Sequence, residues 1–150
     1  MIVTFVKKKI DMNTVLIVVG LLALGFIVLN MVARKQMKNA PSVADHEKIV
    51  TLTEQNFQAQ TKNKLVLVDF WASWCAPCRM MAPVLNDAAA ELNDNTRIGK
   101  VNIEDFQSLA QKFKIRNIPT MVLFKNGVEV SRFSGVKNKD YILKLIQNAQ

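Results

Sequence analysis

Cysteine is scarce in this chain, which contains only Cys75 and Cys78 among its 150 residues. Small secreted proteins that depend on disulfides for their stability carry many more cysteines, so this class is excluded. A bridge between two cysteines that are separated by only two residues would also restrict the unfolded chain very little. Stabilisation of the fold is therefore the weakest explanation for this pair.

Histidine is scarcer still, and His46 is the only one. A structural zinc site needs four ligands, which two cysteines and one distant histidine cannot supply. Covalent attachment of haem would need a histidine directly after Cys78, where Arg79 stands. The sequence also lacks the glycine-rich fingerprint of a dinucleotide-binding site. We therefore expect no metal and no bound cofactor.

Basic residues are in excess, with a formal net charge of +8, but their pattern is not that of a nucleic-acid-binding protein. Most of the chain carries scattered lysines and arginines that form no stripe interleaved with aromatic residues. The excess lies near the N-terminus, on both sides of an apolar run, as is typical of a membrane segment. We expect no nucleic-acid partner.

The apolar run TVLIVVGLLALGFIVLNMVA, residues 14–33, contains no charged residue. A helix of about 20 residues spans roughly 30 Å, the thickness of the hydrocarbon core of a bilayer. A cleaved signal peptide is the alternative, but Arg34 and Lys35 stand where a cleavage site needs small neutral residues. We expect a single transmembrane helix that anchors the protein in the lipid bilayer.

The sequence predicts four segments around this helix. They are a basic tail at 1–13, the transmembrane helix at 14–33, a polar linker at 34–47 and a folded domain at 48–150. Lysines precede the helix and basic residues follow it, so the count of positive charges does not decide the orientation. Arg34 and Lys35 slightly favour a cytoplasmic folded domain, as would a start at Met12, and an extracytoplasmic domain is the alternative.

From residue 49 the sequence alternates between strand and helix patterns. We expect strands over IVTL, KLVLVDFW and RIGKVNI, and a hairpin over TMVLFKNGVEVSRF. Helices are expected from Thr53 through Gln60, from Ala76 to Leu92 with Pro83 inside, over EDFQSLAQKF and over KDYILKLIQNA. The dipeptide Asn126-Gly127 is a strong signal for the hairpin turn. This order predicts an α/β fold, a mixed sheet with helices on both faces.

The helix after the strand KLVLVDFW begins within the sequence CAPC. Cys75 then lies at the helix N-terminus, where free N–H groups and the helix dipole stabilise a thiolate. Pro77 suits the first turn, because no N–H is needed there. The thiolate is the nucleophile of disulfide exchange, so Cys75 should attack first and Cys78 should resolve the mixed disulfide. The spacing predicts a redox couple.

Asp69 lies near the end of the apolar strand that precedes the cysteines. An ionised carboxylate is costly inside a protein, so burial should raise the pKa of Asp69 into a range useful for exchanging protons. A solvated position at the edge of the sheet is the alternative. Lys100, in RIGKVNI, could supply a compensating charge from the adjacent strand and so tune Asp69, or could be an ordinary exposed lysine.

Residues 49–150 resemble the thioredoxin family along their whole length. The resemblance rests on VDFWASWCAPC, Pro83, KVNIED, IRNIPT, LFKNG and Gly135, in that order. It implies a thioredoxin fold, with a five-stranded mixed sheet and four helices, and protein disulfide reductase activity on client proteins. The redox group would be the Cys75–Cys78 disulfide itself, and a separate reductase would supply the electrons.

The resemblance also implies roles for single residues. Cys75 attacks, Cys78 resolves and Asp69 handles the proton of Cys78. Pro119 is expected to be cis and to face the cysteines. The backbone around it and the surface beside the cysteines would bind the client, through Trp74, Ala76, Pro77, Ile118, Pro119, Thr120 and Gly135.

The sequence departs from the family's commonest motif at Ala76, which stands in place of a glycine. The residues between the cysteines tune the redox couple, so this change bears on the redox potential. A docking module that binds partners at the Trp74–Pro119 surface without turnover is the alternative function.

Overall fold

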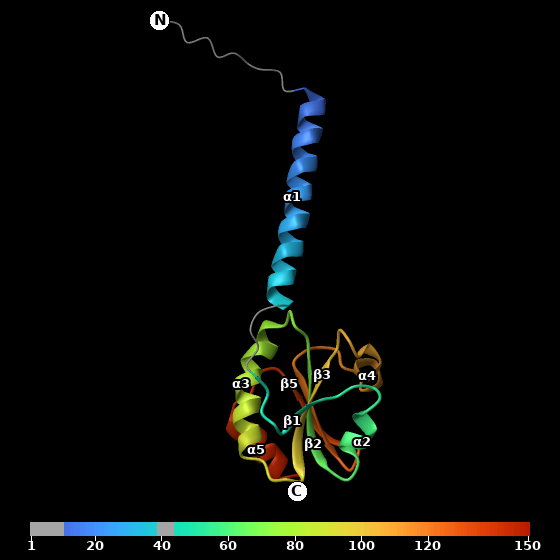
Figure 1. The fold of residues 1–150 in the computed structure, drawn as a ribbon, viewed down its shortest axis with the longest axis vertical. Helices are drawn as coiled ribbons and strands as arrows, with labels where there is room; N and C mark the ends of the chain where they lie inside the picture. The colour runs from blue at the N-terminus through green and yellow to red at the C-terminus, as the bar shows by residue number, and fades with distance from the viewer. Residues whose placement is uncertain (1–10, 39–43) are drawn as a thin grey trace, which may run out of the picture. The chain divides into compact units, whose positions relative to one another are not determined.

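The computed structural model describes residues 11–38 and 44–150 of the chain. The chain divides into two compact units, Met1–Ala40 and Pro41–Gln150. In its described part, the first unit consists of helix α1, and the second contains the sheet and the other helices (Figure 1).

Helix α1, Met12–Lys38, extends beyond both ends of the predicted span at 14–33. Residues 34–38 of the predicted linker, RKQMK, are thus part of the helix. Arginine, lysine, glutamine and methionine all have high helix propensity, which explains the extension. Residues 1–10 of the predicted basic tail and residues 39–43 of the predicted linker, with Pro41, lie outside the described residues.

The second unit is built on a five-stranded sheet in the order β1-β3-β2-β4-β5. The strands are β1 (Ile49–Thr51), β2 (Leu65–Trp71), β3 (Thr96–Asn102), β4 (Thr120–Lys125) and β5 (Val128–Ser134). Strand β3 pairs in parallel with β1 and β2, whereas β4 pairs antiparallel with β2 and β5. The predicted mixed sheet is confirmed, with β2 at its centre.

Four helices cover the sheet: α2 (Phe57–Thr61), α3 (Ala76–Ala90), α4 (Gln107–Lys112) and α5 (Lys139–Gln147). Figure 1 shows α3 and α5 on one face and α2 and α4 on the other, which confirms the predicted helices on both faces. Thr53 was expected to begin the first of them, but its hydroxyl accepts from the N–H of Asn56 and so belongs to the preceding turn.

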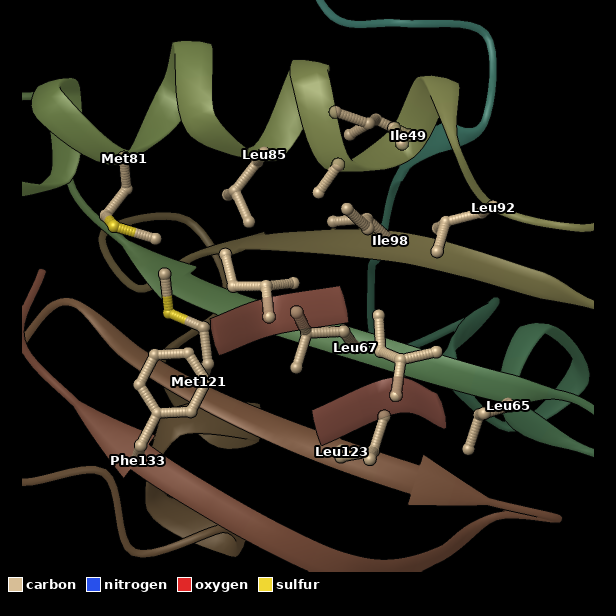
Figure 2. Close-up of a cluster of buried hydrophobic side chains, with 14 residues drawn as sticks. Ile49, Leu65, Leu67, Met81, Leu85, Leu92, Ile98, Met121, Leu123 and Phe133 are labelled. Atoms are coloured by element: carbon tan, nitrogen blue, oxygen red, sulfur yellow. The ribbon is translucent and has the colours of Figure 1, made fainter. Parts of the chain in front are cut away.

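Each face of the sheet carries its own apolar core, because successive side chains of a strand point to opposite faces. Leu65 and Leu67 of β2 pack with Met81 and Leu85 of α3 (Figure 2). The alternate residues of β2 pack on the other face, with α2 and α4, in a cluster with Leu52, Phe57, Val101, Leu109, Val122 and Phe124. Strand β2 is buried on both faces, as its apolar sequence predicts.

Two local features follow directly from sequence. Asn126 and Gly127 both have positive φ, 55° and 80°, as the two central residues of a type I′ hairpin turn require. Pro77 lies in the first turn of α3, where its missing N–H costs nothing.

Pro83 lies inside α3, which nevertheless continues to Ala90. The helix ends two residues before the predicted Leu92.

Candidate active site

The two cysteines form a disulfide at the start of α3, directly after the central strand β2. The S–S distance is 2.06 Å and the two Cα atoms are 5.3 Å apart. Each cysteine is only 4% exposed, so burial does not distinguish them. The Cys75–Cys78 disulfide that the resemblance implies is therefore present in the structure.

The surroundings of the two sulfurs differ. Cys75 is the N-cap residue of α3, and its Sγ accepts a hydrogen bond from the backbone N–H of Cys78 over 3.2 Å. The free N–H groups of a helix N-terminus favour negative charge at this position. An opened disulfide would therefore carry its thiolate preferentially on Cys75.

The loop before the cysteines is held by Glu104. Ser73 donates to Oε2 of Glu104 twice, from its hydroxyl over 2.6 Å and from its N–H over 3.1 Å. The guanidinium of Arg79 donates to the carbonyl of Ser73 over 3.1 Å. Between these fixed points Trp74 is 53% exposed. The side chain that the resemblance implies for client binding thus follows a residue that three hydrogen bonds hold in place.

Sequence reasoning missed the roles of Ser73 and Glu104. Glu104 lies in the family motif KVNIED, which does not by itself indicate what this glutamate contacts. The contact joins residues that are 31 positions apart, and only the parallel pairing of β2 with β3 brings them together.

The structure also brings the predicted client-binding backbone to the cysteines. The Ile118–Pro119 peptide bond is cis, as the resemblance implies. Ile118 packs against the cluster of Ala72, Cys75 and Cys78. Among the described residues, neither the N–H nor the C=O of Ile118 has a hydrogen-bond partner.

The residues around Pro119 are closely tied together. The N–H of Gly135 donates to the carbonyl of Pro119 over 2.9 Å, and the φ of Gly135 is +84°, a conformation that favours glycine. The hydroxyl of Thr120 lies 2.7 Å from both the carbonyl of Asn117 and the hydroxyl of Ser134. Thr120 is buried and lies in β4 between Phe70 of β2 and Ser134 of β5. Ala76 and Pro77, in contrast, are exposed.

Asp69 is buried and only 2% exposed, so the alternative of a solvated edge position is wrong. It pairs with Lys100 of β3 and Met121 of β4. The alternation along β2 places Asp69 on the same face as Leu67, which is the face that α3 covers. Its Oδ1 has no hydrogen-bond partner among the described residues.

Burial raises the pKa of Asp69 to about 7, because an ionised carboxylate loses its hydration there. The charge of Lys100 opposes this shift, and the negative charge of Asp45 adds to it. Near neutral pH, Asp69 can thus both accept and return a proton. The raised pKa that the sequence predicts is confirmed.

Lys100 is not an ordinary exposed lysine, because its side chain is only 13% exposed. Its ammonium group lies 2.8 Å from Oδ1 of Asp45 and 5.0 Å from the centre of the Trp71 ring. In the sequence, Asp45 is one of several polar residues of the predicted linker at 34–47. Its contact with Lys100 spans 55 positions and has no signal in the sequence. The described residues contain no cluster of three or more metal-binding side chains.

Comparison with known proteins places this site in a family. Residues 48–148 match the sequence model of the family described as Thioredoxin. The thioredoxin of Chlamydia pneumoniae is 45% identical over 95 residues, which cover 63% of this chain and 92% of the relative. The thioredoxin of Bacillus subtilis strain 168 is 40% identical over 98 residues, which cover 65% of this chain and 94% of the relative.

A further relative, from Mycobacterium leprae, is named bifunctional thioredoxin reductase/thioredoxin. It is 40% identical over 97 residues, which cover 63% of this chain and 21% of the relative. The matched region holds the whole sheet, its four helices and the Cys75–Cys78 pair. The chain therefore belongs to the thioredoxin family of thiol–disulfide oxidoreductases.

Proposed function

We propose that this protein is a membrane-tethered protein disulfide reductase. Its catalytic domain is the thioredoxin domain, residues 48–150, and its redox group is the Cys75–Cys78 disulfide. The proposal rests on two features that occur together: the disulfide lies at the N-terminus of α3, and the buried Asp69 lies on the face of the sheet that α3 covers. A surface that only docks partners needs neither feature.

The reaction begins with the reduced dithiol. The thiolate of Cys75 attacks one sulfur of the client disulfide, so a mixed disulfide forms and the other client sulfur leaves as a thiolate. The sulfur of Cys78 then attacks Sγ of Cys75, forms the Cys75–Cys78 disulfide and releases the second client sulfur. Two electrons pass from the dithiol to the client.

Asp69 serves the second step. Cys78 is buried and must lose its proton before it can attack, and a carboxylate with a pKa of about 7 can accept that proton near neutral pH. Lys100 tunes Asp69, because its positive charge favours the ionised form of the acid. Asp69 returns the proton when the disulfide is reduced again.

The client binds as an extended chain beside the disulfide. The unpaired N–H and C=O of Ile118 supply the backbone hydrogen bonds, in the manner of an added strand. The remaining contacts come from the residues that surround the cysteines, namely Trp74, Ala76, Pro77, Pro119, Thr120 and Gly135. A backbone-directed site of this kind accepts many client sequences.

The electrons come from a separate reductase. The chain has no glycine-rich dinucleotide fingerprint of its own. The name of the Mycobacterium leprae relative joins a thioredoxin reductase and a thioredoxin in one chain, which supports a reductase as the electron donor.

Helix α1 supplies the tether. Residues Met12–Val32 form one candidate membrane span with a mean hydropathy of 2.8. Apart from Asn13, Thr14 and Asn30, the side chains of this span are apolar, and they lie on all sides of the helix, so it has no continuous polar face. We place the catalytic domain in the cytoplasm, because Arg34 and Lys35 directly follow the predicted span.

The test of the reductase function compares the wild-type chain with a Cys75→Ser/Cys78→Ser variant. Reduced full-length protein in detergent should reduce a client disulfide, and the variant should have no activity in the same assay. A variant that kept the biological function of the protein would instead support the docking module.

The side of the membrane is tested in intact cells with a thiol reagent that cannot cross membranes. A cytoplasmic Cys75 reacts only after the cells are permeabilised. Labelling of Cys75 in intact cells would place the catalytic domain on the extracytoplasmic side.

A further inference from the structure

The segment that leads into β1 is fastened to α3 by one side chain. The Asn86 amide donates from Nδ2 to the carbonyl of Ala44 over 2.8 Å, and its Oδ1 accepts from the N–H of His46 over 2.8 Å. These two bonds hold the backbone on both sides of Asp45. The position of Asp45 is therefore set by α3, the helix that carries the redox cysteines.

From this position Asp45 reaches a residue of the active site. Its Oδ1 lies 2.8 Å from the ammonium group of Lys100, whose side chain is mostly buried. The same ammonium group lies over the ring of Trp71, 5.0 Å from its centre. A cation held by a carboxylate and an aromatic ring has a defined place rather than the freedom of a surface lysine.

Lys100 and Asp45 are the charged groups that act on Asp69. Lys100 pairs with Asp69 from β3, and Asp45 acts from the segment before β1. On the other side of Asp69, the neighbouring strand β4 places the apolar Met121 opposite it. On the same face of the sheet, α3 contributes Met81 to the core and carries Cys78, which titrates once the disulfide is opened. Burial is the largest cause of the raised pKa of Asp69, and the charges of Lys100 and Asp45 modify it in opposite directions. No hydrogen bond to Oδ1 of Asp69 is present among the described residues to stabilise either of its forms.

We propose that Asp45, held by Asn86, is a positioning residue: it binds the ammonium group of Lys100 and so sets how readily Asp69 takes up and releases a proton. The linker that precedes the catalytic domain thereby contributes a charge to the active site. This inference rests on the proposed role of Asp69 in proton transfer.

The direction of the effect follows from the charges. Asp45 offsets the positive charge of Lys100, and its own negative charge disfavours ionisation of Asp69. Asp45→Asn removes both effects and should lower the pKa of Asp69. A more acidic Asp69 is a weaker base toward Cys78, so the pH profile of the resolving step should move to lower pH.

The test titrates the Asp69 carboxyl carbon by NMR in the oxidised full-length protein, solubilised in detergent with carbon-13-labelled aspartate. An Asp69→Asn spectrum assigns the signal. Asp45→Asn should lower the midpoint by on the order of half a pH unit. Asn86→Ala should lower it by less, because Asp45 then loses its anchor but keeps its charge. Asp45→Glu, which keeps the charge, should stay closer to the wild type than Asp45→Asn.

Glu47→Gln is the matched control. It removes the same charge from an exposed carboxylate two residues away, which has no ion pair among the described residues. In Glu47→Gln, the titration midpoint of Asp69 should equal that of the wild type. An unchanged midpoint in Asp45→Asn, or an equal shift in Glu47→Gln, would overturn the proposal.

The result of this NMR test can be distinguished from the result of the tests of the proposed function. The NMR midpoint reports on Asp69 whether or not the protein turns over. Normal turnover in Asp69→Asn would remove the proton-transfer role of Asp69 and yet leave the measured effect of Asp45 on its titration standing.

Discussion

The backbone N–H of Cys78 donates a hydrogen bond to Sγ of Cys75. Cys75 holds the N-cap position of α3, and the same N–H would stabilise negative charge on its sulfur once the disulfide is opened. The two sulfurs are equally buried, so this hydrogen bond is the observation on which the proposed order of attack rests.

The order of attack can be tested by trapping. A Cys78→Ser variant should accumulate mixed disulfides with client proteins, because Cys75 can still attack but no thiol resolves the product. A Cys75→Ser variant should accumulate none. Non-reducing gels and mass spectrometry of the trapped species give the measurement, and trapping by Cys75→Ser alone would reverse the two roles.

Asp69→Asn should slow reduction near neutral pH, with the loss in the resolving step. Asparagine has the size of aspartate but cannot take the proton of Cys78, so single-turnover kinetics should show a normal first step and a slower second one. Loss of about 10²-fold is the scale expected for a general base. Equal rates for both proteins across the pH range would rule out the proton-transfer role.

The same residue should make stability depend on pH. The pKa of Asp69 is raised in the folded state, from 3.8 to about 7, so folded protein binds this proton more tightly than unfolded protein. The stabilisation that Asp69 gives the folded protein is greatest below pH 3.8 and is lost as the pH rises through about 7. Between pH 3.8 and a pH above 7, the free energy of unfolding of the wild type should therefore fall by on the order of 4 kcal/mol more than that of Asp69→Asn. Urea titrations of both proteins at pH 5 and pH 8 check the sign.

The contact between Ser73 and Glu104 should matter for client reduction. Ser73→Ala removes the 2.6 Å hydroxyl bond, and we expect it to cost about 1 kcal/mol of stability and to lower kcat/KM by loosening the loop of Trp74. Ser108→Ala is the matched control, since Ser108 also donates to a glutamate, Glu54, over 2.6 Å but lies on α4. Client reduction should be unchanged in this control.

The tether can be tested by washing membranes. If residues 14–33 span the bilayer, the protein should stay with membranes in high salt and in alkali, because salt screens lysine–headgroup attraction but does not weaken apolar burial. A truncated protein that begins at Pro41, the first residue of the second unit, should be soluble and should reduce disulfides at close to the full-length rate. Release of the full-length protein by salt alone would make α1 a peripheral element.

Most of the fold could be predicted because its signals are local. The alternation of strands and helices, the Asn126-Gly127 turn and the apolar run of β2 each depend on neighbouring residues. The boundaries were less certain for the same reason. RKQMK has high helix propensity, which carried α1 past the predicted end, and Thr53 has the chemistry of a cap but caps a turn instead.

The site was predicted only where its chemistry is concentrated in one segment. Cys75 and Cys78 lie together in the sequence, and Asp69 stands out because it interrupts an apolar strand. Glu104 and Asp45 could not be found in this way. Neither acid stands out in the sequence, and each is brought to its partner by tertiary contacts: Glu104 follows β3, which pairs with β2, and Asp45 is held beside Lys100 through Asn86 of α3.

The strand order also has a mechanical consequence. The chain enters the sheet through β1, a three-residue edge strand, whereas the redox cysteines follow β2 at the centre of the sheet. Tension along a membrane tether would load the two Asn86 hydrogen bonds first and then peel β1 from β3. Strand β2 would keep both of its neighbours during this peeling. Tension on such a tether would therefore reach Asp45, which lies on the loaded segment, before it reached the cysteines that follow β2.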